Sequence, residues 1–211
     1  LKEIYGSRID DLELKTLLEY EIGHLDAIRG DYDSAIEMLS SCLKYFEKPV
    51  SDYDKYMYVM IGTSLAEAYS NKGFSDRAWR VIVSIKDIPT SIGSEDLLFK
   101  ARFHLYGTLG LYYYNLYDYR KALEYYEERL KVSQKMDDPK YYVFTLLGLA
   151  NIYEALDEDE RALDILEDVY NFMSKTGYTY MKALTELVIA DIYRKMNRYY
   201  DALEYISRAY S

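Results

Sequence analysis

The chain has 211 residues, half of them hydrophobic, so it can bury a substantial core and wholesale disorder is excluded. The 26 basic and 36 acidic residues give a net charge of −10. Since no basic block offers a footprint for phosphate, this segment is not expected to contact nucleic acid directly. No apolar run approaches the roughly 20 residues of a membrane-spanning helix, and the single cysteine, Cys42, indicates a reducing, cytoplasmic setting.

Apolar residues recur at helical spacing along nearly the whole chain, interrupted by short polar turns. In chain order this spacing predicts helices at 11–29, 33–47, 53–72, 75–87, 95–116, 118–136, 140–156, 159–175, 179–196 and 199–210. Pro49, Pro89 and Pro139 fall between helix pairs, where a helix must stop. Gly30 and Gly73 fall at turns within pairs, where we expect them to cap the preceding helix.

An internal repeat connects these helices. Each turn within a pair leads to an alanine, and these alanines are 43, 44, 40 and 40 residues apart: Ala35, Ala78, Ala122, Ala162 and Ala202. Twelve residues before each alanine stands another small residue: Gly23, Ala66, Gly110, Ala150 and Ala190. Three positions further on stand Asp26, Tyr69, Tyr113, Tyr153 and Tyr193. Small residues on both helices predict a close contact within each pair, repeated down a stack.

This pattern resembles the tetratricopeptide repeat, in which Leu-Gly-x-x-Tyr precedes an alanine and a later large apolar residue, as in Leu109-Gly110-x-x-Tyr113 followed by Ala122 and Tyr126. The resemblance implies an all-α, right-handed α-solenoid of about five antiparallel helix pairs. The repeats would span 11–47, 53–87, 95–136, 140–175 and 179–211 in one domain, 1–211. The period exceeds the family's usual 34 residues and is similar to arrays of bacterial peptide-sensing and signal-transducing regulators. A HEAT-like array, with a period near 40, is the second interpretation.

The resemblance also implies a function, the binding of a protein or peptide in a concave groove lined by the first helix of each pair. The family's groove-facing positions correspond here to Tyr20, His24, Met60, Thr63, Glu67, Asn71, His104, Leu111, Tyr114, Asn115, Phe144, Leu147, Asn151, Glu154, Leu187, Asp191 and Arg194. The three asparagines are suited to holding a peptide backbone. The acidic residues Glu67, Glu154 and Asp191 would favour a partner with basic residues.

The sequence carries no recognisable catalytic or metal-binding motif. Neither a Gly-rich phosphate loop nor a Ser/His/Asp set occurs, and His24 and His104 lack the partner ligands of a metal site, so we expect no enzyme, cofactor or metal. The chain starts at Leu1 without an initiator Met or a signal-peptide pattern, so we expect a docking or sensory domain of a longer regulatory protein. The alternative is self-association through the C-terminal helix, whose apolar side has no polar cap after it.

Overall fold

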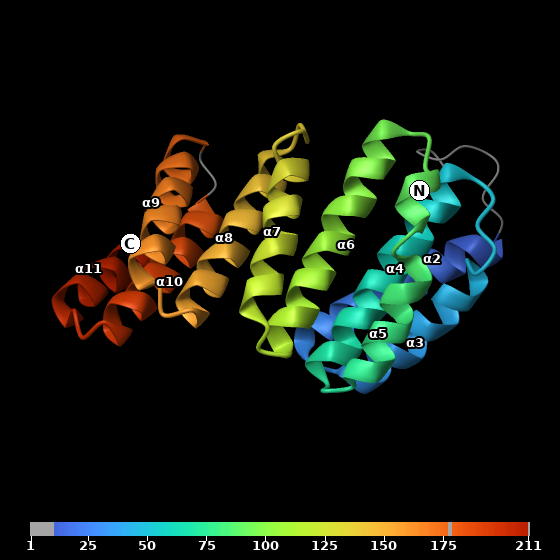
Figure 1. The fold of residues 1–211 in the computed structure, drawn as a ribbon, viewed down its shortest axis with the longest axis horizontal. Helices are drawn as coiled ribbons and strands as arrows, with labels where there is room; N and C mark the ends of the chain where they lie inside the picture. The colour runs from blue at the N-terminus through green and yellow to red at the C-terminus, as the bar shows by residue number, and fades with distance from the viewer. Residues whose placement is uncertain (1–10, 177–178, 211) are drawn as a thin grey trace. The chain divides into compact units, whose positions relative to one another are not determined.

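The computed structural model describes residues 11–176 and 179–210, which are helical and contain no β-strand (Figure 1). The all-α prediction is therefore confirmed. The helices are α2 (Asp11–Arg29), α3 (Tyr32–Tyr45), α4 (Asp52–Asn71), α5 (Ser75–Ile85), η1 (Ile88–Ser91), α6 (Glu95–Asn115), α7 (Tyr119–Ser133), α8 (Pro139–Ala155), α9 (Asp159–Thr176), α10 (Thr179–Lys195) and α11 (Tyr199–Ala209). Within the described residues, no helix combines the length and apolar character needed to cross a membrane.

The chain divides into two compact units, unit 1 (Leu1–Leu116) and unit 2 (Tyr117–Ser211). In unit 1, α2 packs against α3 and α4 packs against α5, while α4 also contacts both α2 and α6. In unit 2, α8 packs against α9 and α10 against α11, and further contacts join α7 to α8 and α9 to α10. Each unit therefore stacks helix pairs as the repeat predicts. The continuity of one array across both units stays a prediction.

The turns within the helix pairs share one backbone feature, a residue with positive φ. Gly30 and Gly73 have φ of +84° and +83°, which a glycine adopts without steric cost, so their predicted role as caps is confirmed. The corresponding turns of the later pairs use non-glycine residues with φ of 58° to 61°: Tyr117, Asp157 and Asn197. The turn geometry is thus kept where the glycine is absent, at a cost in steric strain.

The start of α4 is fixed by two sets of hydrogen bonds. The Ser51 hydroxyl accepts from the Asp54 N–H at 3.0 Å, and the Asp54 carboxylate accepts from the Ser51 N–H at 2.9 Å, which together form a capping box. One carboxylate oxygen of Asp52 accepts from the N–H groups of Gly93 and Ser94, at 3.0 and 2.8 Å. These two bonds hold the pKa of Asp52 below its usual range and tie the beginning of α4 to the beginning of α6.

The link between α5 and α6 contains a helical turn that the sequence did not predict. Pro89 was expected only to end a helix, but it is buried within the single 3₁₀ turn of η1. The ammonium group of Lys55 donates a hydrogen bond of 2.7 Å to the Ser91 carbonyl oxygen at the end of this turn. Proline suits such a turn because its ring already fixes φ near the helical value.

The small residues of unit 1 lie at close contacts between helices, as predicted. A Cβ atom on Gly23 would lie 3.2 Å from Cγ of Leu39, and Ala35 on the same second helix is fully buried. Ala66 and Ala78, the predicted small residues of the next pair, are also fully buried. The repeat pattern did not include Gly62, where a Cβ atom would lie only 2.6 Å from Cγ2 of Ile85. Larger side chains at these positions would force the paired helices apart, since protein interiors have little spare volume.

The same arrangement recurs in unit 2. Ala122 and Ala162 are both fully buried, which is where the repeat places its small residues. Ala162 belongs to a core cluster that also contains Leu166 of α9 and Ile189 and Ile192 of α10. The apolar stripe of one pair is therefore covered by the first helix of the next pair, which is the packing that the repeat requires.

Candidate partner-binding site

The first helices of successive pairs in unit 1 are α2, α4 and α6, and α4 contacts both of the others. These helices carry most of the predicted groove residues of this unit. We use the name first-helix face for Tyr20 and His24 of α2, Met60, Glu67 and Asn71 of α4, and His104, Leu111, Tyr114 and Asn115 of α6. Side-chain hydrogen bonds between neighbouring helices show which of these residues the fold brings together.

Two of these hydrogen bonds join adjacent helices. Ser64 Oγ lies 3.2 Å from Nδ1 of His24 and links α4 to α2. The Thr108 hydroxyl donates a hydrogen bond of 2.6 Å to the Glu67 carboxylate and links α6 to α4. Because Thr108 is neutral, this bond stabilises the carboxylate without cancelling its charge.

The third link connects two asparagines that the sequence predicted as separate contacts for a peptide backbone. The amide of Asn115 donates to the Ser70 hydroxyl at 3.0 Å and to the Asn71 carbonyl oxygen at 3.3 Å. Asn71 is exposed and Asn115 is half-buried. A partner would therefore meet the two amides as one hydrogen-bonded pair.

Two predicted residues are more buried than the sequence indicated. Tyr20 is only 7% exposed, and its ring stacks on His24 with centroids 6.0 Å apart. Burial raises the pKa of Tyr20 to about 12, so the hydroxyl stays neutral at physiological pH. Thr63 is 2% exposed and donates its hydroxyl hydrogen bond to the Met60 carbonyl oxygen at 2.9 Å. The expectation that Thr63 faces a partner is wrong, because its side chain lies in the core.

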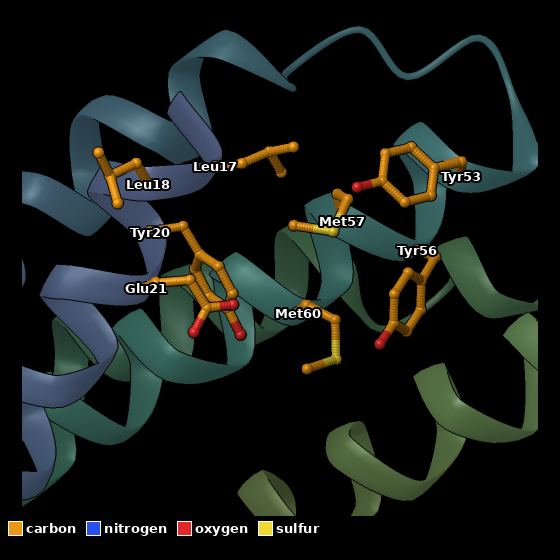
Figure 2. Close-up of a pocket in the computed structure, with 8 residues that line it drawn as sticks. All are labelled: Leu17, Leu18, Tyr20, Glu21, Tyr53, Tyr56, Met57 and Met60. Carbon is orange, nitrogen blue, oxygen red and sulfur yellow. The ribbon is translucent and has the colours of Figure 1, made fainter. Parts of the chain in front are cut away.

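A pocket of about 290 Å³ opens between α2 and α4. It is lined by Leu17, Leu18, Tyr20, Glu21, Tyr53, Tyr56, Met57 and Met60. Figure 2 shows the α2 side chains on one side, the two α4 tyrosines on the other and the methionines between them. Glu21 is the one charged residue among the eight that line this pocket.

The sequence identified Tyr20 and Met60 but missed the other residues of this pocket. The missed signal lies on α4, where Tyr53 and Met57, and likewise Tyr56 and Met60, are separated by one helical turn. An aromatic residue followed four positions later by methionine, twice in one helix, marks an apolar stripe wider than the core requires. Of the four residues of this stripe, the family's groove positions include only Met60.

The predicted acidic residues of unit 2 lie beside basic side chains. Arg194 donates hydrogen bonds of 2.9 and 2.6 Å to the Asp191 carboxylate. The ammonium group of Lys195 lies 3.9 Å from the Glu154 carboxylate and 3.4 Å from that of Asp159. Burial raises the pKa of Glu154, although Lys195 acts in the opposite direction. Asp191 therefore has its own basic partner, whereas Glu154 shares Lys195 with Asp157 and Asp159, and this group of carboxylates stays negative overall.

The apolar and amide positions predicted on α8 differ from one another. Phe144 and Asn151 are exposed and remain available to a partner. Leu147 is half-buried and packs against both core clusters of unit 2, so its main role is structural. Helical spacing alone could not distinguish the exposed Phe144 and Asn151 from the half-buried Leu147, because residues three and seven positions apart lie on the same side of a helix.

The three predicted groove residues of α10 lie on a second apolar surface. Leu187, Asp191 and Arg194 line a pocket of about 420 Å³ together with residues of α11. We call this surface the α10–α11 face, and its lining residues are Leu187, Ala190, Asp191, Arg194, Tyr199, Ala202, Leu203 and Ile206. The sequence indicated an apolar side on the last helix but did not connect these α10 residues with it.

A comparison between equivalent positions 40 residues apart explains this exposed surface. Leu163 and Leu166 of α9 are 7% and 0% exposed, because they belong to a core cluster with residues of α10. Their equivalents in α11, Leu203 and Ile206, are 63% and 39% exposed. The α10–α11 face is therefore the stacking surface of a repeat, without a further helix on it in the described residues.

Two segments match family models described as tetratricopeptide repeat, residues 103–135 and 145–171. These matches favour the tetratricopeptide pattern over the HEAT-like alternative. No curated protein matches the sequence of the chain.

Several solved structures share the fold. A STAND (signal transduction ATPase with numerous domains) protein with a tetratricopeptide repeat sensor, from Pyrococcus horikoshii, is 22% identical with a TM-score of 0.76; the match covers 94% of this chain and 30% of that protein. A putative kinesin light chain with tetratricopeptide-like repeats from Podosopora anserina is 17% identical with a TM-score of 0.66, covering 92% of both chains. A Rap protein complexed with competence and sporulation factor is 13% identical with a TM-score of 0.58, covering 95% of this chain and 64% of that one.

Proposed function

We propose that this chain, a member of the tetratricopeptide repeat family, binds a protein or peptide through the first-helix face of unit 1. The observation that supports the proposal is the Asn71–Asn115 hydrogen bond between α4 and α6, on helices that also carry half-buried apolar side chains and the Glu67 carboxylate. Apolar anchors combined with a few oriented polar groups suit recognition of a peptide. We propose no catalytic role, in keeping with the scaffold character of tetratricopeptide arrays.

We further propose that the chain acts as a docking or sensory domain of a larger regulatory protein. One supporting observation is the match to the STAND protein, which carries a tetratricopeptide repeat sensor. This match spans less than a third of that protein, so the similar part is one portion of a longer chain. The Rap protein with the same fold was solved with competence and sporulation factor bound. A helical array that presents one face to a ligand is compatible with both uses.

Selection of displayed peptides against the full chain, followed by affinity measurement on variants, tests the face assignment. Asn71→Ala removes an exposed amide from the first-helix face. Asn171→Ala removes an exposed amide from the second helix α9 and serves as the matched control. Losing one hydrogen bond should weaken binding by about 3- to 10-fold for Asn71→Ala. Selected peptides that bind both variants like the parent chain would contradict the assignment.

The α10–α11 face supports a second candidate function, self-association. Leu203 and Ile206 leave an apolar stacking surface exposed, and surfaces of this kind mark interaction sites. Light scattering over a range of concentrations measures the oligomeric state. We expect association of the parent chain, its loss in Leu203→Glu, and its retention in Leu184→Glu, a control at an exposed α10 leucine outside this face. A monomer at every concentration would contradict self-association.

A further inference from the structure

The pocket between α2 and α4 combines aliphatic and thioether side chains with aromatic rings. Leu17, Met57 and Met60 provide aliphatic and thioether surface, while Tyr20, Tyr53 and Tyr56 provide three aromatic rings. Figure 2 places the methionines between the tyrosine of α2 and the tyrosines of α4. A long, unbranched side chain could lie along the methionines with its end near the rings.

The one charge among the eight residues that line this pocket is negative. Glu21 lines the pocket and is exposed, and no basic residue is among the eight that line it. Glu67 approaches from α4 closely enough that both carboxylates raise the pKa of Tyr20, after the larger effect of burial. On α2, the nearby Lys15 pairs with Glu19, at 3.5 Å. The pocket therefore presents the Glu21 carboxylate and three tyrosine rings, with no cation among its eight lining residues.

We propose that this pocket binds one basic side chain of the partner, arginine in preference to lysine. This proposal rests on the proposed function, since it assigns a specificity to the same face. The aliphatic stem would pack on Met57 and Met60, and the charged end would meet Glu21 and the tyrosine rings. Arginine fits better because its planar guanidinium stacks on aromatic rings and pairs with carboxylates in a fixed geometry. A pocket of about 290 Å³ is small for a drug-sized ligand and suits one side chain.

Methyl NMR on the full chain tests this proposal with a simple probe. The chain has seven methionines, and two of them, Met57 and Met60, line the pocket, so their methyl signals report directly on its occupancy. The probe is Nα-acetyl-arginine amide at millimolar concentration, and the control is Nα-acetyl-citrulline amide, which has the same shape without the charge. We expect the arginine probe to shift both methyl signals, with at least fivefold higher affinity than citrulline.

Two charge variants on α2 distinguish a specific effect of the Glu21 carboxylate on arginine affinity from a general effect of negative charge. Glu21→Gln removes the carboxylate of the pocket, whereas Glu19→Gln removes an equal charge two residues away outside the pocket. We expect Glu21→Gln to reduce arginine affinity toward that of citrulline and Glu19→Gln to leave it within about twofold. Equal binding of arginine and citrulline, equal effects of the two variants, or unmoved Met57 and Met60 signals would each overturn the proposal.

Failure of the arginine pocket and failure of the first-helix face as a binding surface can be told apart. Selected peptides that lose affinity with Asn71→Ala but show no dependence on arginine would keep the first-helix face as a binding surface and remove only the basic pocket. Selected peptides whose affinity Asn71→Ala leaves unchanged would instead remove the face itself.

Discussion

Replacing Gly148 with alanine tests how closely α8 packs on α7 in unit 2. A Cβ atom at Gly148 would overlap Cε1 of the Tyr126 ring and lie 2.7 Å from Cζ and 2.9 Å from Cδ1. Moving this ring should cost about 1–3 kcal/mol, as for other overpacked cores. The alanine also gains about 1 kcal/mol of helix propensity. The net loss of stability in Gly148→Ala should therefore be about 0–2 kcal/mol.

A double-mutant cycle with Tyr126→Ala isolates the overlap. Without the ring, only the propensity effect remains, so Gly148→Ala should now stabilise the chain by about 1 kcal/mol. The coupling energy should then be about 1–3 kcal/mol. Urea unfolding followed by circular dichroism on all four proteins measures it. A coupling energy within about 0.5 kcal/mol of zero, the range of independent sites, would refute this account of the packing.

Three further substitutions test individual features of the fold, each by urea unfolding. The Glu186 side chain is 2% exposed, and its Oε1 accepts no hydrogen bond within the described residues, although the Lys182 ammonium lies 3.8 Å from it. Leu146 stands at the equivalent position 40 residues earlier. Glu186→Leu should therefore stabilise the chain by about 1–3 kcal/mol, because the cost of burying the carboxylate exceeds the gain from this partly exposed ion pair, and a loss of stability would contradict this expectation. Asp157→Gly should stabilise by about 1 kcal/mol because it relieves φ of +58° at the turn, and an unchanged midpoint would show that no strain exists there. The pKa of Asp52 is lowered in the folded chain, so its hydrogen bonds stabilise the fold above the unfolded pKa of about 3.8 and lose this effect as pH falls through the lower folded pKa. Asp52→Asn should therefore be less stable than the parent chain at neutral pH, and the difference in stability should shrink in acid. A difference in stability that does not depend on pH would contradict this expectation.

The sequence predicted the helices well because their signals are local. Apolar spacing of 3.6 residues, the glycines at 30 and 73 and the prolines between pairs set the helix bounds to within three residues. The buried Ala122 and Ala162 follow from the repeat, since a small residue must stand wherever two helices approach closely. These features depend on neighbours along the chain or on the comparison of repeats.

The site was predicted only in part because side-chain exposure depends on how neighbouring helices rotate against each other. Thr63 has a groove position in the family pattern, yet packing in unit 1 turns it into the core. Glu21 follows Tyr20 in sequence and was not selected, although it lines the same pocket. Gly148 was also missed, since only the position of the Tyr126 ring on another helix shows why its lack of a side chain matters.

Photo-crosslinking tests the central claim, that a partner binds the first helices of unit 1, most directly. A photoreactive benzoyl-phenylalanine is placed either at Met60 on the first helix α4 or at Val83, an exposed position on the second helix α5, and selected peptides are added. We expect peptide crosslinks from position 60 and none from position 83. Crosslinks from position 83 with none from position 60 would contradict it.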